Sequence, residues 1–340
     1  MRTATAEQLS RYSLDLLTAS GANQESAEAA TWALLHASLH GVDSHGIRLL
    51  PWYAECLRSG KVNGMPNVRM EMVRKAAARL DADGGLGHLA MYRAMDEACA
   101  IARDCGIGMV AVVHSTHFGP AGAYTLAAAE AGFIGLVTGN SVAYVVPHDG
   151  KTPIHGTNPI SFATPNSNGE PFLMDMATSA FPWNKVLRYR TEGLELPQGV
   201  AVDTHGHFVT DPHQAVALAP VGGQGFGFKG AALAGVADIL SGVLTGMRIS
   251  TQQDHDALCD VELGHFVMAI DPTLFMPLTA FGSGLQAYLD GFKSQPGTYA
   301  AGGPEWERRK IRERDGIPLP EGLYAELRDA AGAAEIGFAL

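Results

Sequence analysis

The stretch of residues 106–124 constrains the fold of this chain most, because an apolar run ends there at a polar turn that contains histidines. Residues 109–113 read MVAVV, a short, uncharged and largely β-branched run that is typical of a strand buried on both faces. An alanine-rich helical pattern follows at 123–130. Ligands of open α/β sheets bind at such strand ends, and helix N-termini bind anions. The pattern therefore predicts a ligand site at His117 and an anion site at the start of the helix, although it is not a GxGxxG fingerprint. The alternative is that His114 and His117 are ordinary turn residues.

Neighbouring segments extend this strand, turn and helix into a sheet. Residues 68–73, 77–82 and 133–137 have strand patterns, and residues 88–104 have a helical one. An alternation of strands and helices is typical of an α/β fold, so we expect a largely parallel sheet. No linker or repeat separates the chain cleanly, which indicates interleaved units.

Composition narrows the classes of partner. The chain has 340 residues, of which 46% are hydrophobic and 17% charged, as in a compact globular protein. Its formal net charge is −11 and it has no Lys/Arg cluster, which argues against nucleic acid and anionic membranes as partners. We therefore expect a small molecule, or a second copy of the chain, as the partner.

The pattern of cysteines and the expected lack of a long apolar segment favour a cytoplasmic protein. Cys56, Cys99, Cys105 and Cys259 are scattered without a CxxC pair, which favours reduced thiols over a disulfide or zinc framework. No segment is expected to approach the roughly 18 apolar residues of a membrane span.

A second polar loop follows the helix predicted at 24–40. Residues 43–48 read DSHGIR and place several polar side chains together; a plain turn between helices is the alternative. His36 and His40 lie four residues apart, as metal ligands on a helix can, but no HExxH motif or acidic residue completes such a site. We therefore predict no metal.

Lys229 stands at the head of a predicted helix that runs to Leu244 and follows a glycine-rich stretch. A cation there opposes the helix macrodipole unless an anion lies nearby. The position predicts an anionic ligand, with a solvated lysine as the alternative.

Five separated segments carry a resemblance when they are taken in order. They are DSHG at 43–46, HSTHFGPAG at 114–122, GTNP at 156–159, DMATS at 175–179 and GQGFGFKG at 223–230. Over about residues 5–320 the chain resembles the malate/L-lactate dehydrogenase family, which also contains ureidoglycolate dehydrogenases and diketogulonate reductases.

The resemblance implies a nicotinamide-dependent oxidoreductase with NAD or NADP as cofactor. It also implies an α/β fold that is not of the Rossmann type, with interleaved helical, central and cofactor domains. The expected domains are residues 1–66 with 305–340 (helical), 67–118 with 225–304 (central) and 119–224 (cofactor-binding). A homodimer with the site near the subunit interface is expected.

The resemblance also assigns roles to residues. His45 is the expected acid/base with Ser44 as its relay, but His117 matches a histidine that some members use as the base, so both remain candidates. We expect Arg48, Tyr53 and Thr157 to bind a carboxylate substrate. The residues expected at the cofactor are His117, Phe118, Gly119, Ser141, Asp175, Met176, Ala177, Lys229, Gly230, Gly303, Pro304 and Glu305.

Two departures from the family pattern bear on the substrate. The family often reads SHGxxR, whereas the arginine here is one place earlier, at Arg48, and Leu49 takes the usual position. Reductases of cyclic imino acids tend to carry an acidic residue shortly after the DMATS segment, but this chain has Trp183-Asn184-Lys185. We therefore favour a small 2-hydroxy acid, with pyrroline- or piperideine-2-carboxylate reduction as the first alternative. A metal-dependent hydrolase or ligand-binding protein is the second.

Overall fold

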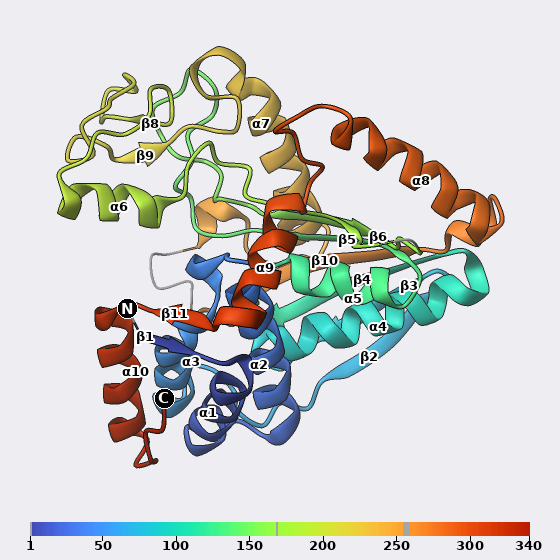
Figure 1. The fold of residues 1–340 in the computed structure, drawn as a ribbon, viewed down its shortest axis with the longest axis horizontal. Helices are drawn as coiled ribbons and strands as arrows, with labels where there is room; N and C mark the ends of the chain where they lie inside the picture. Colours follow the sequence, from blue (N-terminus) through green and yellow to red (C-terminus); the bar gives the residue numbers. More distant parts are fainter. Residues whose placement is uncertain (1, 168, 254–258) are drawn as a thin grey trace.

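A computed structural model describes residues 2–167, 169–253 and 259–340. A central sheet separates a helical part, which carries both chain ends, from a loop-rich part at the opposite side (Figure 1). In the order of pairing, the seven strands are β2 (Arg69–Arg74), β3 (Ala77–Asp81), β4 (Ile107–Ser115), β10 (Leu263–Ile270), β5 (Ile134–Gly139), β6 (Ile160–Thr164) and β7 (Phe172–Met176).

The expectation of a largely parallel sheet is wrong. Within this sheet β3 and β4 are the one parallel pair, and every other neighbouring pair is antiparallel. The reason is β10, which inserts between β4 and β5 so that Val267 lies opposite both Val110 and Val137. Strands β3, β4 and β5 still run in one direction, so the ends of β4 and β5 stay at one edge of the sheet.

Helices cover both faces of the sheet. Helices α4 (Gly87–Cys105) and α5 (Gly122–Glu130) lie between the sheet and the N-terminal helices, with Met91 and Met95 in the main core. Gly108 lets α4 approach β4, because a Cβ there would lie 2.1 Å from the Ala98 carbonyl oxygen. The other face carries α7 (Gly223–Asp238) and the π-helical turn η3 (Ile239–Val243), which meets β5 through a hydrogen bond between the Thr138 and Ser241 hydroxyls.

The helical part is built from both ends of the chain. It contains α1 (Ala6–Ala19), α2 (Gln24–Leu39), α3 (Leu50–Arg58), α9 (Gly303–Asp315) and α10 (Glu321–Ala333). Strand β1 (Arg2–Ala4) pairs with β11 (Ile317–Leu319). The capping box expected at Thr5 and Gln8 is confirmed, because each side chain bonds to the other residue's backbone N–H. The Tyr12 hydroxyl donates to the Leu327 carbonyl and joins α1 to α10.

The loop-rich part has a small core of its own around Val145, Val186 and Leu218. It contains α6 (Trp183–Glu192) and the short pair β8 (Ala201–Val202) and β9 (Ala217–Leu218). Helix α8 (Leu278–Lys293) lies at the outer edge of the molecule (Figure 1). Among the described residues there are also the 3-10 turns η1 (Asp43–His45), η2 (Ile47–Leu49), η4 (Ser250–Gln252) and η6 (Pro272–Leu274).

Two sequence expectations need correction here. Cys56 of α3 and Cys259 form a disulfide across 203 residues of sequence, whereas Cys99 and Cys105 are free thiols, so the prediction of four reduced thiols is wrong for one pair. By length and composition alone, Gly223–Val243 would be able to cross a membrane, although the sequence was expected to contain no such segment. One side of this helix packs on the sheet, with Gly230, Ala234 and Ala237 buried.

Candidate active site

The loop that carries His45 is held from both ends of the chain. The Ser38 hydroxyl, on α2, accepts the Ile47 backbone N–H at 2.8 Å, and Gly46 packs directly against Ser38. Arg312, on α9, donates both guanidinium nitrogens to the Asp43 carboxylate and one of them also to the Ser38 carbonyl. The Arg312 side chain is 6% exposed and that of Asp43 is 62% exposed. These contacts fix the loop that presents Ser44 and His45.

Two histidine rings meet in front of this loop. His117 follows the end of β4, and its ring stacks on that of His45 with centroids 5.8 Å apart. Each ring is held through Nδ1 by a hydroxyl: Ser44 Oγ lies 2.9 Å from His45 Nδ1, and Tyr53 Oη lies 2.5 Å from His117 Nδ1. Trp52 contacts the His117 ring edge-on at 6.2 Å. The structure thus brings together Ser44, His45, Tyr53 and His117.

Burial keeps both rings neutral. Desolvation lowers the pKa of His45 below its ordinary value. Desolvation also lowers the pKa of His117, and the nearby histidines His45, His88 and His265 lower it further because a second positive charge would be repelled. Both side chains are only partly buried, so a small molecule can reach them. Neutral imidazoles at this position can accept a proton or donate an N–H at neutral pH.

A protein carboxylate occupies the anion site predicted at the start of α5. Asp175, at the end of β7, accepts the Gly122 backbone N–H at 2.7 Å. The site therefore holds an internal anion where the sequence pattern favoured a ligand. Desolvation raises the pKa of Asp175 to about 6, against the lowering effect of this hydrogen bond, and Glu305 on α9 raises it further. Asp175 nevertheless remains accessible to solvent.

Ser141 and Thr157 form a second polar group beside the histidines. Ser141 Oγ accepts the Thr157 backbone N–H at 3.1 Å, and the two hydroxyls lie 3.3 Å apart. Phe118 links this group to the histidine pair, because its buried ring packs against Gly139 at the end of β5. Gly119 is also buried, has a positive φ of 69° and lies against His88. Met176 and Ala177 are partly buried at the end of β7.

Lys229 and Gly230 lie in the first turns of α7. The Lys229 ammonium stacks over the exposed rings of Phe226 and Phe228, at 5.3 and 5.9 Å from their centroids. Phe226 has a non-helical backbone, so the regular part of the helix begins just before Lys229. Gly230 is buried because its Cα faces the Val221 backbone, where a Cβ would lie 2.3 Å from an oxygen. The turn Gly303, Pro304 and Glu305 opens α9.

The cavity that Arg48 lines contains neither His45 nor His117 in its wall. Arg48 is exposed and lines this surface cavity of about 430 Å³ between α3 and α10, together with Trp52 and Arg58. Trp52 forms the connection between this cavity and His117. In the described parts of the chain Arg48 has no hydrogen bond or ion pair, whereas Arg58 pairs with Glu55.

The histidines weighed as metal ligands contact different groups. His114 Nδ1 lies 3.1 Å from Asp81 Oδ1, whereas His117 Nδ1 bonds to the Tyr53 hydroxyl. His36 and His40 stack at 4.2 Å, and His40 packs edge-on against Trp306 of α9. No cluster of three metal-ligating side chains occurs within residues 2–167, 169–253 and 259–340.

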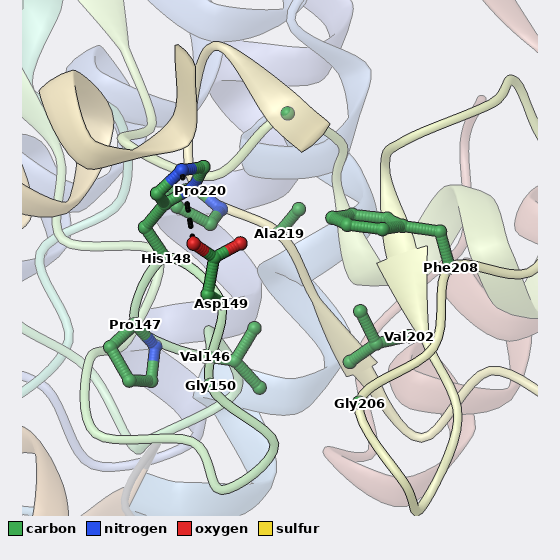
Figure 2. A pocket seen from close by; sticks show the side chains of 11 residues that line it. Val146, Pro147, His148, Asp149, Gly150, Val202, Gly206, Phe208, Ala219 and Pro220 are labelled. Atoms are coloured by element: carbon green, nitrogen blue, oxygen red, sulfur yellow. Dashed lines mark ion pairs between the residues drawn. The ribbon is translucent and has the colours of Figure 1, made fainter. Parts of the chain in front are cut away.

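A smaller cavity of about 140 Å³ lies in the loop-rich part (Figure 2). In the close-up, His148 and Asp149 face each other at 3.7 Å on one wall, and Phe208 and Val202 form the other. Gly223, at the start of α7, also lines it. The predicted catalytic residues lie elsewhere, so this cavity is separate from the histidine pair.

Several residues around the site carried no signal in the sequence. Arg312 reaches the His45 loop from the far end of the chain. His88 and His265 are fully buried behind Tyr53 and Phe118, and burial lowers their pKa values to about 3 and about 4. A lone histidine in an apolar segment looks the same in a sequence whether it lies at a site or in a core.

Comparisons with known proteins cover nearly the whole chain. The family model described as malate/L-lactate dehydrogenase matches residues 4–328. Malate dehydrogenase from Pyrococcus horikoshii is 36% identical over 96% of this chain and 93% of its own length. Its solved structure matches with a TM-score of 0.90 over 99% of this chain and 97% of that chain, at 32% identity.

Two further proteins differ from it in the activity that their names state. The ureidoglycolate dehydrogenase (NAD(+)) of Escherichia coli K12 is 32% identical over 90% of this chain and 89% of its own. The solved structure of delta1-piperideine-2-carboxylate reductase from Pseudomonas syringae has a TM-score of 0.87 and 30% identity, covering 97% of this chain and 100% of that one.

Proposed function

Because this chain belongs to the malate/L-lactate dehydrogenase family, it is an NAD(P)-dependent dehydrogenase of hydroxy acids, and we propose a small 2-hydroxy acid as its substrate. The proposed substrates are of the malate, lactate or ureidoglycolate type. The observation that carries this proposal is the pair of neutral imidazoles, His45 and His117, which lie 5.8 Å apart and are both partly exposed. Oxidation of a carbinol needs a group that takes the hydroxyl proton, and a neutral histidine suits that step.

Arg48 is the proposed carboxylate-binding group. It has no ion-pair partner among the described residues, and Trp52 borders both its cavity and the His117 ring. A guanidinium can bind a carboxylate through two parallel hydrogen bonds, which would orient the acid end of the substrate. Thr157 is the proposed second contact to the substrate.

The residues around Ser141 fit a dinucleotide. The Asn140 side-chain oxygen is buried and has no partner among the described residues, so it can accept an N–H from a ligand. The Ser141 and Thr157 hydroxyls follow in the same group, and Gly156 lets Ser141 pack closely, because a Cβ there would lie 2.2 Å from the Ser141 carbonyl oxygen. When bound, the nicotinamide supplies the hydride acceptor or donor. The proposed cofactor-binding residues are His117, Phe118, Gly119, Ser141, Asp175, Met176, Ala177, Lys229, Gly230, Gly303, Pro304 and Glu305.

The alternative function is reduction of cyclic imino acids. It is favoured by the likeness to delta1-piperideine-2-carboxylate reductase. Against it stands the start of α6, where Asn184 and Lys185 follow Trp183, and the Lys185 ammonium stacks over Phe181. No acidic side chain is available there to protonate an imine nitrogen, so we favour the hydroxy acid.

A cytoplasmic homodimer is part of the proposal. Leu233, Val236, Ile239 and Val243 form an apolar stripe along α7 and η3, and they are between 42% and 63% exposed. A second copy of the chain is the proposed cover for this stripe. Light scattering during gel filtration measures the mass, and a monomer at micromolar concentration would contradict this part of the proposal.

Initial rates decide between the two substrate classes. We expect turnover of 2-oxo acids or of ureidoglycolate-type hydroxy acids with NADH/NAD or NADPH/NADP. The same panel contains pyrroline-2-carboxylate and piperideine-2-carboxylate. Turnover of the cyclic imines alone would overturn the hydroxy-acid proposal in favour of the alternative.

A further inference from the structure

The two histidines of the proposed site have hydroxyl partners of different character. Ser44 Oγ faces His45 Nδ1 and can donate to it or accept from it, because a partly exposed serine hydroxyl can also bond to solvent. Tyr53 Oη faces His117 Nδ1 from within the core, and Tyr53 is 1% exposed. The direction of the second hydrogen bond is therefore restricted in a way that the first is not.

Tyr53 has one acceptor for its proton within the described parts of the chain. Burial raises the pKa of Tyr53 well above its ordinary value, so the phenol keeps its proton. His88 lies edge-on against the Tyr53 ring at 4.6 Å, but neither of its ring nitrogens has a hydrogen-bond partner. An O–H that pointed elsewhere would be a buried unpaired donor, which is unfavourable. The Tyr53 hydroxyl therefore donates to His117 Nδ1.

A nitrogen that accepts a hydrogen bond carries no proton in neutral imidazole, so the other nitrogen must. His117 is neutral, because it faces His45 of η1, His88 of α4 and His265 of β10 as well as Trp52 and Tyr53 of α3. Its proton is therefore on Nε2. No described residue bonds to this Nε2–H, which leaves it free for a ligand that reaches the partly exposed ring.

We infer that Tyr53 is a positioning residue that fixes His117 as a hydrogen-bond donor to the substrate oxygen, and that His45 is the residue that exchanges the proton. This inference rests on the proposed function. It assigns hydrogen-bond donation to His117 and proton exchange to His45. In oxidation the substrate O–H bond breaks and its proton goes to His45 Nε2, while the hydride leaves C2 for the oxidised dinucleotide. His117 keeps its Nε2–H throughout and stabilises the negative charge that develops on the oxygen.

This assignment follows from what each hydroxyl allows. His45 must take the proton at Nε2, so its Nδ1 carries a proton throughout and donates to Ser44 Oγ, whose own O–H can bond to solvent. Tyr53 cannot accept from His117 in this way without leaving its own proton unpaired in the core. The two hydroxyls therefore permit opposite tautomers, with an unprotonated Nε2 on neutral His45 and a protonated Nε2 on His117.

Nitrogen NMR of histidine reads the tautomer directly. In the parent protein, with His117 signals assigned by their loss in His117→Gln, we expect a protonated Nε2 and an unprotonated, hydrogen-bonded Nδ1. In Tyr53→Phe the Nδ1 loses its donor, and we expect the two nitrogen shifts to move toward each other as the ring samples both tautomers. A protonated Nδ1 in the parent, or identical shifts in Tyr53→Phe, would overturn the inference.

Kinetics supply the second arm, with Tyr12→Phe as the matched control. Tyr12 is also buried and hydrogen-bonded, but to Leu327 in the helical part, away from both histidines. We expect Tyr53→Phe to lower kcat about 10–100-fold with little change in KM, as loss of a placed donor does, and Tyr12→Phe to leave kcat unchanged. If Tyr53→Phe and Tyr12→Phe lowered kcat equally, the role of Tyr53 would be structural only. If no hydroxy or oxo acid turns over at all, the proposed function fails, and the NMR arm still decides the role of Tyr53.

Discussion

Asp43→Asn tests whether the far end of the chain controls the catalytic loop. Arg312 is 6% exposed and donates to both Asp43 oxygens, whereas Asp43 is 62% exposed. Removing one partner of a fully buried ion pair costs about 3–5 kcal/mol, and an exposed pair is worth about 0–1 kcal/mol. Asparagine at position 43 keeps one acceptor oxygen for Arg312, and solvent can reach this exposed end of the ion pair. We therefore expect a loss of about 1–2 kcal/mol, or roughly 2–4 °C in Tm per kcal/mol.

The effect on catalysis should exceed the effect on stability. Asp43 lies two residues from His45, and a misplacement of about 1 Å can cost about 100-fold in rate. We expect kcat to fall about tenfold while the dissociation constant of the cofactor stays unchanged. The control is Asp315→Asn, which removes an exposed ion pair with Arg314 on the same helix and should change neither quantity. A lower Tm with normal kcat would refute the reasoning, because it would limit Arg312 to holding α9 in place.

Four other substitutions test the site. His45→Ala should lower kcat about 10²–10⁴-fold with cofactor binding nearly intact; a near-normal kcat would assign the proton transfer to another group. Arg48→Lys should raise KM for carboxylate substrates, because an ammonium cannot make the two-pronged contact; an unchanged KM would place the carboxylate elsewhere. Lys229→Ala should weaken the binding of NADH and NADPH, as measured by fluorescence titration. If the variant and the unmodified protein had the same dissociation constants for both cofactors, the lysine would be only a surface residue. Asp175 has a folded pKa of about 6, above its ordinary value of 3.8, so its protonated form stabilises the protein and that stability is lost as pH rises through 6. Asp175→Asn should therefore raise the free energy of unfolding at pH 8 by up to about 1 kcal/mol, after allowance for the solvent access of this residue, with no gain at pH 4; a lower Tm at pH 8 would contradict this sign.

Local sequence patterns predicted individual helices and strands. The pairing of strands and of cysteines depends on residues far apart in the sequence, and these patterns did not predict it. The β4 strand, its polar turn and the start of α5 could be predicted because their signals lie within 20 neighbouring residues. The insertion of β10 could not, since an apolar strand pattern does not say which strands it will pair with. The Cys56–Cys259 disulfide was missed for the same reason, because its partners are 203 residues apart.

In the candidate site, too, the residues on local motifs could be predicted and the contacts between distant residues could not. Its histidines lie on segments with recognisable local motifs, and the structure brings His45 and His117 together. The role of Tyr53 depends on a hydrogen bond between residues 64 positions apart, and the contact of Asp175 with α5 spans 53 positions. Such contacts depend on tertiary packing, which a motif in a sequence does not describe.

The pairing of β1 with β11 affects how the protein is made. Arg2 lies opposite Leu319, so β1 leaves a ribosome about 300 residues before its partner strand. At about 5–20 residues per second, that delay is roughly 15–60 s. During that time the apolar face of α1, with Leu9 and Leu16, lacks the cover that α10 and β11 give it in the finished protein. We expect the part of the molecule that is synthesised first to be among the last to become stable, and nascent chains that end before residue 300 to depend on chaperones.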